Sequence, residues 1–310
     1  LSVVPGRLEL ALLQRLLPQA EADLPACLAA GLLQQSVSAV GFRHELARQA
    51  LEQSLAPQQA QHLHSVILKA LSQEVADGRS VTAARQLHHA RQAGQTEAVL
   101  SLASQAAAEA ARASDHRQAA SLFALAQAHA HGQALPVRAS LAERHAHECM
   151  LSNQIEAAIG AYQQALTLRA QAGDGVGQGI NHRQMARLVW LRDGAPMALD
   201  HAREAVALLT DRSADRELAM AHATMAQLLQ AADDPDAALT WGRSGLVLAE
   251  PLGDAEALAY TLNSAACAEL RIQDSAPAWA QLRRSLDLSL THGLDEHAAR
   301  AYINLPTLAS

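Results

Sequence analysis

The sequence predicts an all-α fold in which a short N-terminal module precedes a solenoid of stacked helix pairs. Two observations predict this fold. First, half of the 310 residues are apolar, mostly Ala and Leu, and only 3% are aromatic. Ala and Leu favour helices, whereas the residues that favour strands are scarce. Second, alanines recur about every 40 residues from Ala107 onward, as expected for a repeat protein.

The first module occupies residues 1–75 and lacks the repeat. Its apolar pattern predicts, in order, helices over 8–17 and 24–30, a small hairpin from 32–35 and 39–42, and helices over 44–55 and 58–71. This order is close to that of a winged-helix domain. The segment has five basic and six acidic residues, a net charge of −1. DNA affinity depends on neutralising phosphates, so we expect no direct nucleic-acid contact here and an internal packing role instead.

In the second region, residues 80–310, two columns of alanines predict a right-handed solenoid. Twelve residues separate the columns within each unit. The first column is Ala107, Ala146, Ala186, Ala226 and Ala266, and the second is Ala119, Ala158, Ala198, Ala238 and Ala278. Small side chains let helices approach closely, so we expect both columns at helix crossings. Bulkier residues such as Phe123 and Tyr162 would fill the space beside them, and neighbouring units would stabilise one another.

Turn residues separate the predicted helices. Asp115, Asn153 and Asp234-Pro235 are expected to cap or open the second helices of their units. Loops between units are expected at 132–136, 173–179, 211–215, 253–254 and 293–295, and residues 296–309 predict the first helix of a sixth unit. The pattern of Ala158, Tyr162, Ala165 and Leu166 resembles the tetratricopeptide repeat, whose usual unit is shorter, at about 34 residues.

A series of short motifs covers essentially the whole chain. It includes Val3 to Arg7, Leu28 to Leu33, Gly41 to Arg48, Asp115 to Ala120 and His297 to Tyr302. In this order the motifs resemble STAND-class ATP-dependent regulators, including LuxR-type transcription activators of the MalT kind. That resemblance implies a P-loop ATPase, then a winged helix, then a tetratricopeptide-like sensor arm, and often a DNA-binding output domain.

The resemblance implies ATP or ADP as the cofactor of an upstream ATPase, with no cofactor held by this chain alone. The single lysine, Lys69, has no P-loop context. In this family the histidine of the winged-helix motif is thought to contact the phosphates of bound ADP. The resemblance therefore implies that His44 senses nucleotide, with help from Arg43 and Arg48. The alternative is that His44 caps or packs the helix that it begins.

A ligand groove is expected on the first helices of the repeats. Counting back from the alanine columns predicts that it is lined by Glu143, His147, Arg183, Arg187, Trp190, Gln227, Gln230, Asn263 and Arg271. Arg183, Arg187 and Trp190 share one helix face, where they would suit an anionic or planar ligand, or a peptide. The alternative is a solvated arginine face beside a partly buried tryptophan.

The sequence shows no pattern that favours catalysis or a metal site. Histidine pairs spaced i, i+2 point apart on a helix, the adjacent pair His88-His89 is no better, and the three cysteines are widely separated. The glycine-rich stretch 173–179 follows a predicted helix, so a helix end and loop is favoured over a phosphate loop. The acidic turn 233–236 is expected to stabilise a helix N-terminus.

We therefore expect a regulatory sensor or scaffold and not an enzyme. Its partner would be a protein, a peptide or a small-molecule effector, with self-association as a further expectation. The alternative is a freestanding tetratricopeptide scaffold that binds proteins or peptides. Both ends of the sequence resemble cuts within a longer protein, and no signal peptide or membrane-spanning run is found, so a cytoplasmic location is expected.

Overall fold

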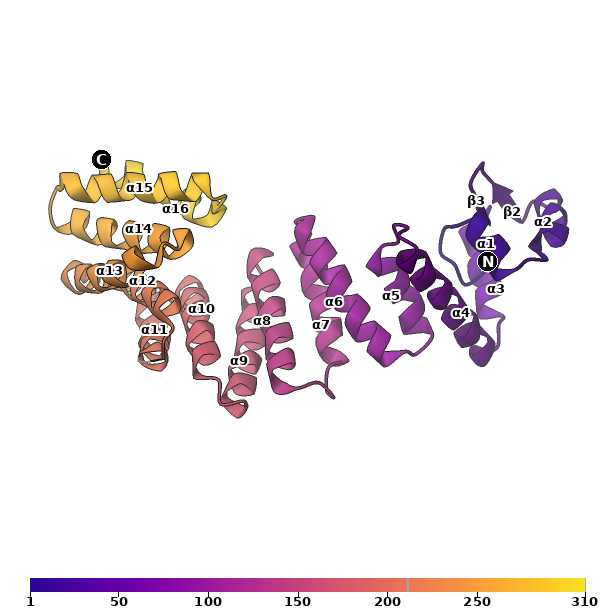
Figure 1. The fold of residues 1–310 in the computed structure, drawn as a ribbon, viewed down its shortest axis with the longest axis horizontal. Helices are drawn as coiled ribbons and strands as arrows, with labels where there is room; N and C mark the ends of the chain where they lie inside the picture. Colours follow the sequence, from indigo (N-terminus) through magenta and orange to yellow (C-terminus); the bar gives the residue numbers. More distant parts are fainter. Residues whose placement is uncertain (211, 310) are drawn as a thin grey trace. The chain divides into compact units, whose positions relative to one another are not determined.

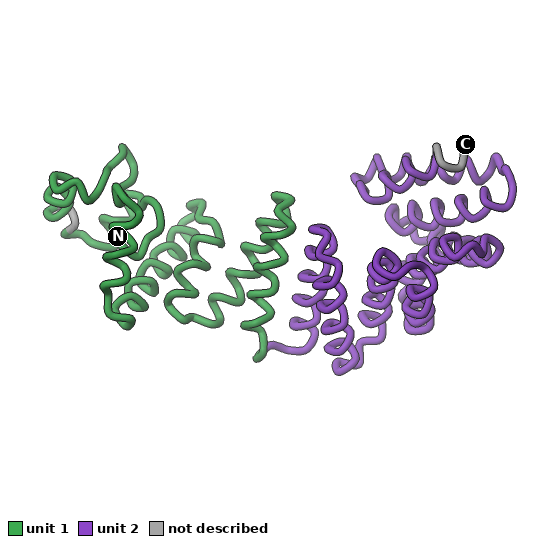
Figure 2. Tube along the Cα trace, turned by 180° about the vertical axis from the view of Figure 1, so that it is seen from behind, with its two compact units in different colours: residues 1–132 green, residues 133–310 purple. Residues whose placement is uncertain are grey.

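The computed structural model describes residues 1–210 and 212–309. The chain forms two compact units, Leu1–Gly132 and Gln133–Ser310, called unit 1 and unit 2 below (Figure 2). The division between them lies within the repeat region. Unit 1 therefore contains both the N-terminal module and the first helices of the solenoid.

The N-terminal module of unit 1 has the predicted helices and hairpin and one additional strand. Its elements are β1 (Arg7–Glu9), α1 (Leu10–Leu16), α2 (Ala20–Ala29), β2 (Leu33–Gln35), β3 (Ala39–Phe42), α3 (Glu45–Gln53) and α4 (Pro57–Ala76). Among the described residues β3 is the central strand of a sheet and pairs antiparallel with β1 and β2 (Figure 1). The pattern missed β1 because three residues are too few to show an alternation, and the first helix begins at Leu10 instead of Leu8.

The core of this module joins the sheet to two helices. Leu8 on β1 lies opposite Val40 on β3, and both are buried. They pack in one apolar cluster with Leu12 of α1 and with Ile67 and Leu71 of α4. The long helix α4 is therefore anchored to the sheet by its apolar face.

Three further helices complete unit 1: α5 (Ala83–Gln92), α6 (Thr96–Arg112) and α7 (His116–Ala128). Each packs against the helix before it, starting with α5 on α4. The N-terminus of α5 is capped by Thr82, whose hydroxyl accepts a hydrogen bond from the backbone N–H of Arg85.

Unit 2 is a run of helices joined by short turns (Figure 1). Its elements are α8 (Leu135–Leu151), α9 (Ile155–Gln171), α10 (Gly175–Asp193), α11 (Ala195–Leu209), α12 (Asp215–Ala231), α13 (Pro235–Ala249), the 3-10 turn η1 (Glu250–Leu252), α14 (Ala255–Ile272), α15 (Ala276–Thr291) and α16 (Asp295–Ala309). Helix α16 confirms the predicted first helix of a sixth unit. Consecutive helices pack as antiparallel neighbours, and α12 also contacts α10 and α14.

Both alanine columns are buried, as the repeat predicted. Every member has 0% of its surface exposed, from Ala107 in α6 to Ala278 in α15. The column that begins with Phe123 and Tyr162 has a glycine, Gly242 on α13, as its fourth member and returns to a large side chain at Leu282. A Cβ atom at Gly242 would lie 2.7 Å from the Cα atom of Ala265 on α14. These helices approach to a distance that only glycine allows.

The turns confirm the expected caps at Asp115 and Asp234, whose carboxylates accept hydrogen bonds from the backbone N–H groups of Gln118 and Ala237. The acidic turn therefore stabilises the start of α13 as predicted. The expectation for Asn153 was wrong. Asn153 makes no cap but ends α8 with φ 59°, a left-handed conformation that asparagine tolerates.

The expected loop over 173–179 needs a similar correction. Gly173 ends α9 with φ 70°, but α10 already begins at Gly175. Asp174 caps α10 by accepting a hydrogen bond from the N–H of Gly177 at 2.8 Å. Gly179 lies inside this helix. A Cβ atom at that position would be 2.6 Å from Leu209 of α11, so the absence of a side chain lets the two helices pack closely. In the expected loop 211–215, Asp211 lies outside the described residues.

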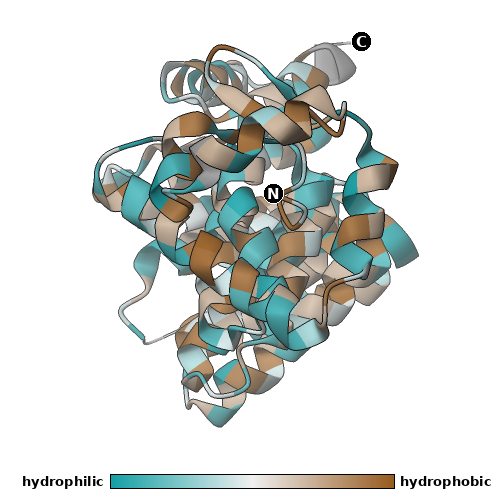
Figure 3. Ribbon diagram, turned by 90° about the vertical axis from the view of Figure 1, so that its right-hand side faces the viewer, coloured by the Kyte–Doolittle hydropathy of each residue, from teal (hydrophilic) through white to brown (hydrophobic). Residues whose placement is uncertain are grey.

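Hydrophilic and hydrophobic residues are both spread over the helices in Figure 3. In the part of the chain that the structure describes, we find no helix that is both long and apolar enough to span a bilayer.

Candidate functional site

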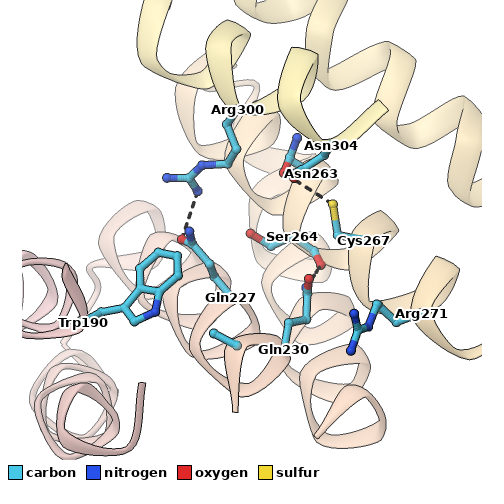
Figure 4. A pocket seen from close by; sticks show the side chains of 10 residues that line it. Trp190, Gln227, Gln230, Asn263, Ser264, Cys267, Arg271, Arg300 and Asn304 are labelled. Atoms are coloured by element: carbon cyan, nitrogen blue, oxygen red, sulfur yellow. Dashed lines mark hydrogen bonds between the residues drawn. The ribbon is translucent and has the colours of Figure 1, made fainter. Parts of the chain in front are cut away.

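A pocket of about 270 Å³ lies in unit 2 between α10, α12, α14 and α16 (Figure 4). The close packing of α12 on α14 forms its base, and α16 supplies a further wall. Most of the lining residues have polar side chains, although apolar atoms make up more of the exposed surface: the lining consists of Trp190, Gln227, Gln230, Ala231, Asn263, Ser264, Cys267, Arg271, Arg300 and Asn304.

Five of the nine residues predicted for the groove line this pocket: Trp190, Gln227, Gln230, Asn263 and Arg271. The other four, Glu143, His147, Arg183 and Arg187, are not part of its lining. On α8, His147 is exposed, and Glu143 accepts hydrogen bonds from Arg169 at 2.7 Å and from Asn181 at 2.8 Å. Glu143 therefore connects neighbouring helices and does not face a ligand.

The predicted arginine face of α10 needs correction. Arg183 is buried and its guanidinium lies 3.5 Å from Glu217 of α12, while Arg187 forms an ion pair with Glu296 of α16. Both cations thus have carboxylate partners from other helices. Of the three residues on this face, Trp190 alone borders the pocket. The spacing on α10 could not reveal these partners, which are 34 and 109 residues away in the chain.

Hydrogen bonds hold the polar side chains of the pocket in place. Gln227 Oε1 accepts hydrogen bonds from Tyr260 Oη at 2.9 Å and from Arg300 Nη1 at 3.1 Å, and Figure 4 shows Arg300 directed at Gln227. Gln230 Nε2 donates to the carbonyl of Ser264 at 2.8 Å. The Arg300 guanidinium also lies 4.4 Å from the ring centre of Tyr260, which adds a cation–π contact.

Asn263 has an unused donor at the pocket. Its side-chain oxygen accepts a hydrogen bond from Asn304 Nδ2 at 2.8 Å. Its own Nδ2 is buried and has no hydrogen-bond partner among the described residues. An unsatisfied buried amide costs about 1–3 kcal/mol.

The charges around the pocket are largely balanced. Arg271 forms an exposed pair with Asp233 at 2.9 Å, and Arg300 lies 3.6 Å from Glu296. Nearby, a hydrogen bond with His297 and the charge of Arg216 lower the pKa of Glu256 to about 2. The site therefore combines fixed cations with neutral amides.

The thiol of Cys267 also borders the pocket, but it is not activated. Burial raises its pKa to about 12, so the thiol stays protonated at neutral pH. A thiolate nucleophile needs a lowered pKa. The geometry of this pocket is therefore suited to binding, with no activated nucleophile at Cys267.

Sequence reasoning missed Arg300 and Asn304, which α16 contributes. A signal was present, because Asn304 follows Ser264 by 40 residues and thus continues the repeat register. Ser264 was not among the predicted groove positions, however, and extending Asn263 by one unit gives Ile303 instead. The hydrogen bond from Asn304 to Asn263 could not have been inferred in this way.

His44 and Arg43, the residues predicted to sense nucleotide, are exposed at the start of α3 in unit 1. His44 occupies the N-cap position, but its side chain makes no capping hydrogen bond. Arg48 is buried and pairs at 2.7 Å with both Glu45 and Glu52. Arg48 therefore holds α3 together, whereas His44 and Arg43 present their side chains at the surface.

No protein-family model matches the sequence, and no curated protein sequence does so. Solved structures do resemble it. The apo form of RapI is 12% identical with a TM-score of 0.57, covering 97% of this chain and 79% of RapI. A Rap protein complexed with competence and sporulation factor is 11% identical with a TM-score of 0.56, covering 81% of this chain and 77% of that one.

A STAND protein with a tetratricopeptide repeat sensor, from Pyrococcus horikoshii, is 11% identical with a TM-score of 0.51. The match covers 97% of this chain, which spans about half (51%) of that protein. At these identities the likeness concerns the fold alone. It confirms the predicted tetratricopeptide-like helical solenoid.

Proposed function

We propose that this chain is a regulatory sensor and scaffold that binds an effector or partner in the pocket of unit 2. The observation that carries the proposal is the pocket itself, whose lining combines Arg271, Arg300 and Trp190 with polar amide side chains.

The ligand should carry hydrogen-bond acceptors and a planar or apolar part. Asn263 supplies one donor, Arg271 and Arg300 supply cationic donors, and Trp190 offers an aromatic surface. Guanidinium groups suit carboxylates. A volume of about 270 Å³ is slightly below the usual range for small-molecule sites, so it fits a small carboxylate-bearing effector or the end of a peptide.

At the finer level, we propose that the chain is the sensor segment of a STAND-type regulator, of the LuxR kind. The ordered motifs of the sequence support this assignment, as does the likeness in fold to a STAND protein of which this chain spans about half. Nucleotide chemistry would then belong to an ATPase domain outside residues 1–310. His44 and Arg43 would contact ADP from the exposed start of α3.

The alternative is a freestanding scaffold that binds a protein or peptide without an ATPase. It is favoured by the likeness to RapI, of which this chain spans 79%. Neither proposal makes the chain an enzyme. Reading the gene on both sides of this segment distinguishes them, because a P-loop upstream supports the STAND assignment and a start codon just before Leu1 contradicts it.

The pocket itself can be tested by thermal-shift screening of the chain against nucleotides, sugars, amino acids and short peptides. A ligand that binds only the folded protein raises the melting temperature. We expect the shift to disappear in Arg271→Ala and Asn263→Leu. The matched control is Arg203→Ala, since Arg203 is an exposed arginine on α11 that pairs with Asp200 outside the pocket. An equal shift in all variants would place the ligand elsewhere.

A further inference from the structure

Three histidines meet between α4 and α5 in unit 1. His64 lies on α4, and His88 and His89 lie on α5. One ring nitrogen from each residue lies within 4.8 Å of the others, and the Nδ1 atoms of His64 and His89 are 2.9 Å apart. His64 and His89 are almost completely buried, with 2% and 1% of their surface exposed.

Hydrogen bonding among these rings satisfies them only in part. A neutral imidazole has one donor and one acceptor nitrogen, so His64 and His89 can share one proton between their Nδ1 atoms. The Nε2 atom of His88 is buried with no partner among the described residues. The ring of His88 is therefore the member of the cluster with an unused nitrogen among the described residues.

Burial also keeps these rings neutral. It lowers the pKa of His64 and His88, and together with the two neighbouring histidines it lowers that of His89 to about 3. A metal ion binds the neutral imidazole and competes with protons for it.

The spacing is close to that of a metal centre. Zinc–imidazole bonds are about 2.0–2.1 Å, so two nitrogens in a tetrahedral site lie about 3.3 Å apart. The observed 2.9 Å between His64 and His89 is slightly shorter, and 4.8 Å is the upper limit for the set. Small rotations of the side chains would bring all three nitrogens into range.

A carboxylate stands behind the cluster, on the other side of His64. Glu52 Oε1 lies 3.6 Å from His64 Nε2, the nitrogen that points away from His89. Metal-bound histidines commonly present their second N–H to a carboxylate, which fixes the ring and makes it a better ligand. The arrangement around His64 has this form.

Two of the three nearby arginines have anionic partners, and the third, Arg91, is exposed on α5. Arg48 is paired with Glu45 and Glu52, and Arg85 is held by Glu9 through two hydrogen bonds of 2.8 Å. Their positive charge is therefore largely compensated. Repulsion of an incoming cation is correspondingly reduced.

A pocket of about 260 Å³ opens beside the cluster. It is lined by Val4, Pro5, Arg85, His88 and His89. Two of the three histidines thus border a space that solvent can enter. This leaves room for a fourth ligand such as water.

We propose that His64, His88 and His89 bind one divalent cation of the zinc type, with the fourth position open to the adjacent pocket. Imidazole ligands suit zinc and its neighbours nickel, cobalt and copper. The metal would tie the last helix of the N-terminal module to the first helix that follows it. This site is separate from the pocket of unit 2 and does not depend on the function proposed for it.

The test uses the full chain after treatment with a chelator. Titration calorimetry with Zn²⁺ should show one equivalent of tight binding, and Co²⁺ should give the visible absorption bands of a tetrahedral site. The variant His88→Ala alters a half-buried position, and His64→Gln keeps a polar side chain of similar size. Each should lose that equivalent. Glu52→Gln should weaken binding roughly 10-fold.

The matched control is His62→Ala, because His62 is exposed on the same helix two residues from His64. It should bind Zn²⁺ as the unaltered chain does. Circular dichroism establishes that each variant is folded. The proposal is overturned if the unaltered chain binds no Zn²⁺, or if folded His88→Ala and His64→Gln retain the full equivalent. In either case the histidines only share a proton.

Discussion

The contact between α4 and α5 in unit 1 buries neutral imidazoles, whereas the contact between α10 and α12 in unit 2 buries an arginine beside a carboxylate. In unit 1, His64 and His89 face each other 2.9 Å apart without charge. In unit 2, Arg183 has 7% of its side chain exposed and relies on Glu217 for compensation. Burying a charge is costly unless it is paired, while a neutral ring needs only a hydrogen bond. The two units should therefore respond differently to the loss of one partner.

The largest effect is expected for Glu217→Leu in unit 2. It leaves Arg183 buried beside an apolar group and also removes a partner of Arg216. Removing one partner of a buried pair costs about 3–5 kcal/mol, and we expect about 3 kcal/mol because Glu217 keeps some solvent contact. All three tryptophans lie in unit 2, so their fluorescence during urea unfolding measures this loss.

The control for this prediction is Asp200→Asn, which breaks the exposed pair with Arg203. Exposed pairs contribute about 0–1 kcal/mol. If Glu217→Leu and Asp200→Asn have equal effects, the charge of Arg183 is not effectively buried and the contrast between the units fails.

A smaller effect is expected for His89→Leu in unit 1, measured without metal. It leaves the His64 Nδ1 atom buried without its partner, at a cost of about 1–3 kcal/mol. The double variant His64→Leu/His89→Leu should recover much of this loss, because removing both polar partners leaves nothing unsatisfied. Far-UV circular dichroism during unfolding follows the helices of both units, and tryptophan fluorescence follows unit 2 alone, so a change seen only by circular dichroism reports unit 1. A double variant less stable than the single one would contradict this and would show that the two rings stabilise unit 1 by their packing as well as by their hydrogen bond.

The pH dependence of unit 2 should follow Glu256. Its pKa in the folded chain is about 2, below the ordinary value of 4.5, so the unfolded chain binds the proton first on acidification. Its contribution to stability is complete above pH 4.5 and is lost as the pH falls from 4.5 to about 2. Glu256→Gln should flatten the decline of the tryptophan-monitored unfolding midpoint in this range. An unchanged slope would assign the acid sensitivity to other carboxylates.

The smallest effect on stability is expected for Arg271→Ala. The pair with Asp233 is exposed on both sides, so its loss should change the free energy of unfolding by less than about 1 kcal/mol. Effector binding should nevertheless be lost, since Arg271 lines the pocket. A large change in the urea midpoint of this variant would show that the residue is structural.

The sequence alone determined the repeat. Its features depend on residues that are close in the chain: the alanine columns, the caps at Asp115 and Asp234, and the final helix. The same local pattern of residues recurs about every 40 residues. Such features follow from helix preference and from the space available at a crossing. The strand β1 and the helical start of α10 were missed because short segments take their structure from distant partners.

Only the tertiary structure decided which polar groups meet. Arg187 and Glu296 are 109 residues apart, Asn304 and Asn263 are 41 apart, and His64 and His89 are 25 apart. These contacts depend on how far each helix is rotated and shifted against the next one. A small error in that rotation or shift would separate the two side chains of a pair. The sequence could therefore indicate five residues of the pocket, but it could not show that two arginines are already paired or that three histidines from two helices form one cluster.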